Sequence, residues 1–299
     1  MRIVTRPDFD GVICAVFLSD TNEITHPTLW VEPSKLQKGL VDIRNGDIIA
    51  NLPWHRESSL WFDHHYTNMI TQPFEGVYKQ APSAAGLIFD YYQNRLKQTA
   101  HYEQLSESAD KIDSADLSHD EILHPENYTD VLLSMTISGS DRSDEPYWNR
   151  LVDLLRQDSL EQIINEPDVN KKCRIVNEQN MIFKKLVYEY TTMQKAVSVT
   201  DFRPVTPAPS GNRFLVYALF PEAVANVRIR YHQSDDTKVI ISVGHSIVNR
   251  RCRVNAGKML SVFEGGGHPG AASCAVPRQD ADRVIRIIID KLQKNDSDS

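Results

Sequence analysis

The chain opens with MRIVTRPDFDGVICAVFL at residues 1–18, and this stretch already indicates the fold class. Its first five residues are mostly apolar and predict a short strand buried in a sheet, while the apolar run at 11–18 predicts a helix packed against that strand. Two more short apolar runs, at 47–50 and 59–62, predict further strands, and Ser83 is placed to cap a helix. Strands that alternate with helices predict an α/β domain with a mostly parallel sheet flanked by helices.

The second half of the chain has a different pattern. Residues 147–195 are highly charged and have a helical periodicity. Residues 203–211 hold three prolines and a glycine, which indicates a domain break or a loop just inside a second domain. Strand-like runs follow at 214–219 and 238–243, and an apolar stripe that ends at Leu292 predicts a closing helix.

We therefore predict two domains in the 299 residues, the first spanning 1–195 and a smaller α/β domain spanning 196–292, with a disordered tail at 293–299. Their charges differ. The first domain holds 19 Lys and Arg against 30 Asp and Glu, whereas residues 196–299 hold 14 against 10, and ten of the 14 are arginines. An acidic part beside an arginine-rich part suits a site that collects a cation and meets an anion.

Composition excludes several classes of protein. No apolar run approaches the roughly 18 residues of a membrane span, and the start of the chain lacks the apolar core of a signal peptide. The four cysteines are widely spaced, which argues against a disulfide framework and for a reducing cytoplasm. Because the net charge is −7, we expect no duplex-DNA partner, and the lack of a long apolar run predicts no membrane partner.

Two groups of candidate metal ligands follow predicted strands. Asp8 and Asp10 come after the first strand, where open α/β sheets place ligands, although either carboxylate can instead cap the next helix. The triplet Asp63, His64 and His65 follows a later strand, and carboxylate and imidazole ligands fit a divalent transition metal such as Mn²⁺.

Two further segments are less decisive from the sequence. Asp113 precedes two small residues and can turn inward, whereas we interpret Asp110 and Asp116 as solvated acids at the end of a helix. In the second domain, a glycine-rich turn lets backbone N–H groups approach an anion, and a histidine and upstream arginines add donors suited to phosphate. These candidate substrate-binding residues are Gly265, Gly266, Gly267, His268, Arg250 and Arg253, beside Arg251.

In this order the motifs resemble the DHH phosphoesterase superfamily with its DHH-associated C-terminal domain, and most closely the exopolyphosphatase-related proteins. The matching stretches are TRPDFDGVICAVFL, GDIIANLPW, LWFDHH and VGHSIVNRRCRVNAGKM with GGGHPGAASC, which together span nearly the whole chain. The resemblance implies two domains with a cleft between them. It also implies hydrolysis of phosphate esters or anhydrides, usually with Mn²⁺, with Mg²⁺ as the alternative ion and one or two ions bound.

The resemblance also implies residue roles. The matching metal-ligand positions are Asp8, Asp10, His64 and Asp113. Asp63 completes the signature with His65, which would face the substrate phosphate or relay a proton, and the glycine-rich turn with His268 would hold the rest of the substrate.

Two positions depart from the family pattern. Val4 and Arg6 stand where a histidine is common, and Asn51 stands where the second motif usually has a bridging aspartate. We therefore expect one well-formed ion site built from Asp10, His64, Asp113 and Asn51, with the other site weakened and Arg6 supplying positive charge near the reaction.

The function that we predict is a metal-dependent phosphohydrolase acting on a small phosphorylated substrate: a short single-stranded oligonucleotide, a linear dinucleotide, a nucleotide or short polyphosphate. The rival interpretation is a binding module of the same fold whose hydrolysis has weakened. A processive single-strand exonuclease fits less well, because the acidic first domain does not suit an extended basic groove. For the oligomeric state, the sequence leaves a homodimer as one alternative.

Overall fold

The structure is a computed structural model that describes residues 1–96, 100–139 and 141–296. The chain divides into two compact units, which we call unit 1 (residues 1–117 and 126–176) and unit 2 (residues 118–125 and the chain from 177 onward). In sequence the units meet inside the long helix α9 (Pro167–Glu189), whereas the prediction put the boundary at 195–196.

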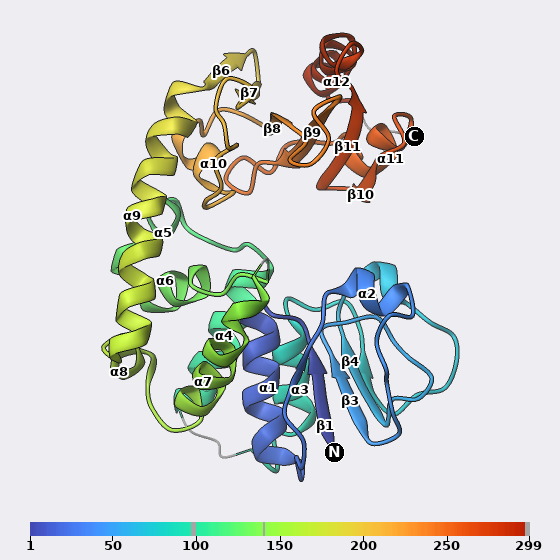
Figure 1. Cartoon of the computed structure of the whole chain (residues 1–299), viewed down its shortest axis with the longest axis vertical. Helices are drawn as coiled ribbons and strands as arrows, with labels where there is room; N and C mark the ends of the chain where they lie inside the picture. Colours follow the sequence, from blue (N-terminus) through green and yellow to red (C-terminus); the bar gives the residue numbers. More distant parts are fainter. Residues whose placement is uncertain (97–99, 140, 297–299) are drawn as a thin grey trace. The chain divides into compact units, whose positions relative to one another are not determined.

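Unit 1 is an α/β domain, as predicted (Figure 1). Its elements in chain order are β1 (Arg2–Thr5), α1 (Phe9–Thr21), β2 (Leu29–Trp30), α2 (Pro33–Gln37), β3 (Asp47–Ala50), β4 (Leu60–Asp63), η1 (Tyr66–Asn68), β5 (Gly76–Tyr78), α3 (Ala84–Tyr91), α4 (Ala100–Asp113), η2 (Pro125–Asn127), α6 (Thr129–Met135), η3 (Arg142–Asp144), α7 (Glu145–Leu155), α8 (Leu160–Ile163) and the start of α9.

The described strands of unit 1 form a parallel sheet in the order β2-β1-β3-β4-β5. Successive side chains of a strand point to opposite faces, and both faces of this sheet are apolar. Ile3 and Ile48 pack with residues of α1, α3, α4 and α7, while Val4 and Ile49 pack on the other side with Leu36 of α2. The sheet is therefore buried on both sides, which leaves the ends of its strands to carry polar groups.

Unit 2 is a mixed-sheet domain. Its elements are α5 (His119–Leu123), the end of α9, β6 (Thr191–Gln194), β7 (Val197–Asp201), α10 (Leu215–Leu219), β8 (Ala225–Tyr231), β9 (Lys238–His245), α11 (Ala256–Ser261), β10 (Gly266–His268), β11 (Ala271–Pro277) and α12 (Ala281–Lys294). The described strands lie in the order β10-β11-β9-β8-β7-β6, with only the β7–β8 pair parallel. One face, with Val227 and Ile229, packs against residues of α11 and α12.

Most predicted elements are confirmed, including the strands at 47–50 and 238–243 and the helix capped by Ser83. The strand predicted at 214–219 is wrong, because this segment forms α10. Four consecutive apolar residues there are buried in one short helix, so the run lacks the periodicity that separates a helix from a strand. α12 continues to Lys294, and residues 297–299 of the predicted tail lie outside the described residues.

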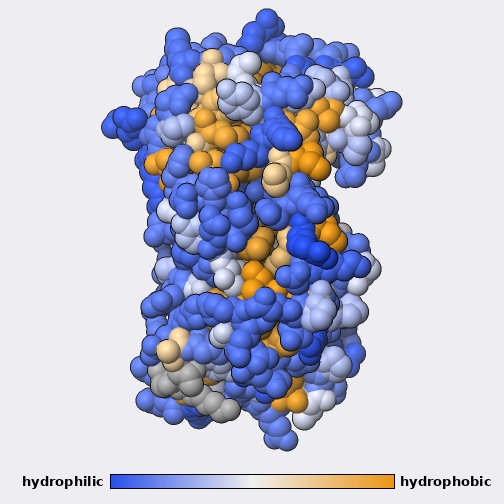
Figure 2. Space-filling model, turned by 90° about the vertical axis from the view of Figure 1, so that its left-hand side faces the viewer, coloured by the Kyte–Doolittle hydropathy of each residue, from blue (hydrophilic) through white to orange (hydrophobic). Residues whose placement is uncertain are grey.

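The surface in Figure 2 is mostly hydrophilic, and its hydrophobic residues gather in several separate groups. Among the helices of the described residues, none is long and apolar enough to cross a membrane.

Candidate metal centre and active site

The predicted metal residues come together in unit 1, where β1, β3 and β4 end side by side. Asp8 and Asp10 follow β1, Asn51 directly follows β3, and Asp63 is the last residue of β4. These three strands are neighbours in the parallel sheet, so their carboxyl ends share one edge. Asp113 arrives from the C-terminal end of α4.

Asp10 is buried and is held by the start of α3. Its two carboxylate oxygens accept hydrogen bonds from the backbone N–H groups of Ala84 (3.0 Å) and Ala85 (2.8 Å). Burial raises the pKa of Asp10 well above its usual range, and the charges of Asp113 and Asp8 raise it further. The carboxylate is thus fixed in place but is electrostatically disfavoured, which is typical of a site that receives a cation.

His64 directs its ring nitrogen Nε2 at two carboxylates. Its Nδ1 lies 3.0 Å from the carbonyl oxygen of Ala81, and because a carbonyl only accepts, Nδ1 is the donor in this hydrogen bond. Its Nε2 lies 3.2 Å from Asp113 Oδ2 and 3.8 Å from Asp10 Oδ2. This nitrogen is buried and has no hydrogen-bond partner among the described residues.

These atoms fit a divalent cation. One ligand atom from each of Asp10, His64 and Asp113 lies within 4.8 Å of the others. At a metal–oxygen distance of about 2.1 Å, neighbouring octahedral ligands lie about 3 Å apart, which is close to the 3.2 Å between His64 and Asp113. Carboxylate oxygens with one imidazole are ligands that Mn²⁺ and Mg²⁺ accept. The assignment of these three residues as metal ligands remains our prediction.

Asp8 has a different local role from Asp10. Its Oδ1 accepts from the backbone N–H of Gly11 (2.9 Å), so it caps α1, and also from Asn51 Nδ2 (2.9 Å). Its Oδ2 pairs with Arg6 Nε at 3.1 Å. Burial raises the pKa of Asp8 to about 6, with the charge of Asp113 adding to the rise and that of Arg6 opposing it. Asp8 is therefore next to the centre, with both oxygens already engaged.

Asn51 also lies beside the centre. Its backbone has a φ of 55°, in the left-handed region that asparagine tolerates better than most residues. Its Nδ2 faces Asp8, while its Oδ1 is buried without a hydrogen-bond partner among the described residues. A buried amide oxygen of this kind is a further acceptor that a cation would satisfy.

Asp63 and His65 form a second, connected pair. The fully buried Asp63 accepts from His65 Nδ1 at 2.8 Å and from Asn68 Nδ2 at 2.7 Å. Burial alone would lower the pKa of His65, but the hydrogen bond and charge of Asp63 outweigh it and raise the pKa. Since Asp63 takes Nδ1, the Nε2 atom is the one that His65, whose side chain is 27% exposed, presents for chemistry.

The supporting role of Asp110 was not predicted. Asp110, interpreted as solvated, instead accepts a 2.6 Å hydrogen bond from Ser83, the residue that caps α3. A Cβ at Gly86 would lie 2.6 Å from Asp110 Oδ1, so a glycine is needed for this close approach. The pair links α4, which carries Asp113, to the helix start that holds Asp10. A serine at a helix cap was visible in the sequence, but its tertiary partner was not.

The predicted substrate residues all belong to unit 2. In place of the predicted glycine-rich turn, residues 266–268 form the exposed edge strand β10 and pair with β11. Gly267 in this strand has a φ of 147°, a value that glycine adopts without strain. Arg250 and Arg253 are exposed: Arg250 Nε donates to the carbonyl of Ile247 at 3.0 Å, and the backbone N–H of Arg253 donates to Asn295.

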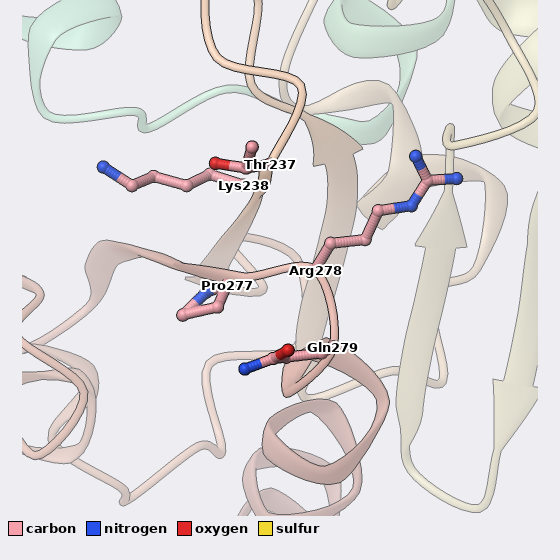
Figure 3. A pocket seen from close by; sticks show the side chains of 5 residues that line it. All are labelled: Thr237, Lys238, Pro277, Arg278 and Gln279. Atoms are coloured by element: carbon pink, nitrogen blue, oxygen red, sulfur yellow. The ribbon is translucent and has the colours of Figure 1, made fainter.

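A hollow of about 530 Å³ in unit 2 lies where β9 begins and β11 ends. It is lined by Thr237, Lys238, Pro277, Arg278 and Gln279. Figure 3 shows the side chains of Lys238 and Arg278 extending away from each other. Lys238 pairs with Asp235 at 3.3 Å, and Arg278 lies over the ring of Tyr231 at 4.5 Å. The two cations therefore do not converge on one anion.

Comparisons with known proteins give structural relatives only, since no family model and no curated protein sequence matches the chain. A solved structure described as the pGpG-specific phosphodiesterase PggH from Vibrio cholerae is 29% identical, with 99% of each chain covered and a TM-score of 0.85. An exopolyphosphatase-related protein from Bacteroides fragilis is 12% identical, with 97% of this chain and 91% of that chain covered and a TM-score of 0.54.

RecJ from Thermus thermophilus, solved in complex with Mn²⁺, is also 12% identical. The match covers 98% of this chain but 52% of RecJ, with a TM-score of 0.59. The likeness to the last two proteins concerns the fold, whereas the first extends over the whole chain at higher identity. Together with the ordered motifs of the sequence, these relatives fit the predicted resemblance to the DHH phosphoesterase superfamily.

Proposed function

We propose that this chain is a metal-dependent phosphodiesterase that hydrolyses a linear dinucleotide of the pGpG kind, with Mn²⁺ held by Asp10, His64 and Asp113. The observation that carries the proposal is His64 Nε2, which has no hydrogen-bond partner among the described residues and faces the carboxylates of Asp10 and Asp113 at the carboxyl edge of the sheet. The substrate follows from the 29% identity over 99% of the chain to a protein described as specific for pGpG.

In this proposal the protein groups divide the work. A divalent ion held by these residues would supply positive charge for the phosphoryl oxygens and would lower the pKa of a water molecule toward neutrality. Asp10, His64 and Asp113 hold that ion, with Asn51 Oδ1 as a further oxygen beside it. Arg6, paired with Asp8, keeps a positive charge near the reacting phosphate.

His65 is proposed as the general acid. Hydrolysis adds the water oxygen to phosphorus, with one water proton released to solvent, and breaks the bond from phosphorus to the leaving oxygen, which then takes up a proton. Asp63 holds the ring through Nδ1, so a proton on Nε2 is available to that oxygen. The raised pKa of His65 keeps the ring protonated to higher pH than a free histidine.

The test is a substrate panel with Mn²⁺ or Mg²⁺: pGpG, longer single-stranded oligonucleotides, pyrophosphate, short polyphosphate and bis(p-nitrophenyl) phosphate, with products separated by chromatography. We expect pGpG to be cleaved to GMP faster than the other compounds, and His65→Gln to lose that activity. Faster cleavage of polyphosphate than of pGpG would overturn the proposal that pGpG is the substrate. Tight nucleotide binding without cleavage would instead support the weakened binding module.

The remaining expectations from the sequence belong to the same proposal. We propose a cytoplasmic protein that binds no duplex DNA, with a homodimer to be tested by its mass in solution. The four cysteines lie in the described residues as free thiols, which accords with a reducing compartment.

A further inference from the structure

The most unusual charge in unit 2 is that of Arg228, in the middle of β8. The side chain is partly buried, and burial lowers the pKa of its guanidinium. The groups that act on it electrostatically are Arg230, Tyr217 and Arg213, with no carboxyl group among them. Within the part of the chain that the structure describes, Arg228 makes no ion pair and no side-chain hydrogen bond.

Strand pairing places Arg228 in a polar row. Directly paired residues of neighbouring strands point to the same face of a sheet. Thr200 of β7 pairs with Arg228, Arg228 with Ser242 of β9, and Ser242 with Ser273 of β11. Val227 and Ile229, which flank Arg228, point to the apolar core. The row therefore lies on the sheet face opposite α11 and α12.

The same face leads to the glycine-rich strand. Gly266 of β10 pairs with Ser273, so it ends the row, and His268 lies two residues further on and therefore on the same face. The predicted substrate residue His268 and the unpredicted Arg228 thus share one surface of unit 2. Gly244 of β9 has no room for a Cβ, because Tyr217 Oη packs against its backbone there.

A partly buried guanidinium without a partner destabilises the folded state. Buried charges in proteins are normally paired, because a buried charge without a partner loses its interaction with water and gains no other. Here the neighbouring charges are also positive, which adds repulsion. The missing partner is an anion, and the planar fork of arginine with adjacent hydroxyl groups is suited to phosphate oxygens.

We propose that Arg228 anchors a phosphate-binding site on this polar face, formed with Ser242 and Ser273 and continuing toward His268. The ligand would be the phosphate of a nucleotide, and its identity as part of a linear dinucleotide rests on the proposed function. Arg228 would thus give unit 2 a preference for ligands that carry a phosphate group.

The first test is binding, which does not depend on cleavage. Mn²⁺-loaded protein is titrated by calorimetry with inorganic phosphate, GMP and guanosine. We expect Arg228→Met to weaken phosphate and GMP binding about 10- to 100-fold, the usual range for losing a charge-assisted contact. Guanosine lacks the phosphate, so its binding should not change. Equal binding of phosphate by both proteins would overturn the site, as would a loss confined to guanosine, which would indicate recognition of the base.

The second test is kinetic. For pGpG, Arg228→Met should raise KM about 10-fold or more and leave kcat within about twofold, while bis(p-nitrophenyl) phosphate, which has one phosphate, is cleaved as before. Arg228→Lys should give an intermediate KM, because it keeps the charge and loses the fork. Arg286→Met, an exposed arginine on α12, is the matched control and should change neither substrate.

Thermal stability separates binding from a structural role. Because Arg228→Met removes an unpaired charge, its melting temperature should equal or exceed that of the wild type. A clear drop with unchanged phosphate binding would show that Arg228 only supports the fold. If the wild type fails to cleave pGpG while Arg228→Met still loses phosphate binding, the proposed function fails and the phosphate site stands.

Discussion

Neighbouring aspartates in this centre differ because of the groups that reach each of them. Asp8 is engaged by the start of α1, by Asn51 and by Arg6, whereas Asp10 is held by the amides of α3 and keeps Oδ2 directed at His64. Two aspartates that are only two positions apart thus differ in role: one caps a helix and the other is a proposed metal ligand. The sequence did not decide either role, because aspartate is both a preferred N-cap residue and a metal ligand.

The first prediction at this scale concerns the general acid. His65→Gln should lower kcat for pGpG by about 10²- to 10⁴-fold, the usual contribution of a positioned proton donor, and leave Mn²⁺ affinity nearly unchanged. Asp63→Asn should give a smaller loss, since the ring stays but loses its orienting carboxylate. Single-turnover rates at saturating Mn²⁺ check this. Full activity of His65→Gln would remove His65 from the mechanism.

The second prediction uses the raised pKa of Asp8. Its pKa is about 6 in the folded protein against 3.8 for the free side chain, so the folded state holds the proton more tightly. In metal-free protein this contribution to stability is present below pH 3.8 and is lost as the pH rises through about 6. Asn also caps helices, so Asp8→Asn keeps the cap and removes the charge.

Metal-free Asp8→Asn and wild type should therefore melt at similar temperatures near pH 4, and the variant should melt a few degrees higher near pH 7. Added Mn²⁺ should narrow that difference at pH 7, because the ion favours the ionised carboxylate. Melting curves in chelator across this range check the result. A variant that is less stable than wild type at pH 7 would be inconsistent with the raised pKa.

At the scale of elements, the start of α3 connects the fold to the site. Ser83 Oγ accepts from the backbone N–H of Gly86 at 2.9 Å and donates to Asp110, while the next two amides bind Asp10. The helix start therefore positions one proposed ligand, and α4 brings another, Asp113, to the same place. The geometry of the centre depends on how these two helices are tied together.

Ser83→Ala should cost about 1 kcal/mol of unfolding free energy, as is usual for a lost helix cap, and should also weaken Mn²⁺ binding several-fold. Ser159→Ala is the matched control, because Ser159 caps α8 with a complete capping box and touches none of the proposed ligands. The control should lose similar stability and keep its Mn²⁺ affinity. Equal Mn²⁺ affinity in the two variants would show that the start of α3 does not position the ligand.

Local patterns predicted the elements better than their contacts. The strands at 47–50 and 238–243 were predictable from short apolar runs, and Ser83 from its position before a helix. The role of Asp110 depends on a partner 27 residues away, which no local pattern contains. Arg228 was missed for a related reason. The alternation in ANVRIRY predicts which residues face away from a core, but only the fold shows that none of the described carboxyl groups acts on Arg228.

At the scale of the whole molecule, the two units have separate cores. The apolar cluster around α1 and the unit 1 sheet shares no residue with the cluster around α11 and α12. The proposed metal ligands all lie in unit 1, and the proposed phosphate site lies in unit 2. Each ligand should therefore stabilise the unit that binds it.

Calorimetric unfolding is expected to show two transitions, with Mn²⁺ raising one of them and inorganic phosphate raising the other. The Asp113→Asn variant should lose the response to Mn²⁺ and keep the response to phosphate, while Arg228→Met should show the opposite. A single transition that both ligands raise together would show that the units unfold as one.

The central claim is that Asp10, His64 and Asp113 hold one divalent ion. It is tested most directly by counting bound Mn²⁺ with electron paramagnetic resonance in wild type, Asp10→Asn, Asp113→Asn and the exposed control Asp116→Asn. We predict one tightly bound ion in the wild type and the control, and at least a tenfold weaker affinity in Asp10→Asn and Asp113→Asn. Unchanged Mn²⁺ affinity in folded Asp113→Asn, or no bound ion in the wild type, would contradict the account.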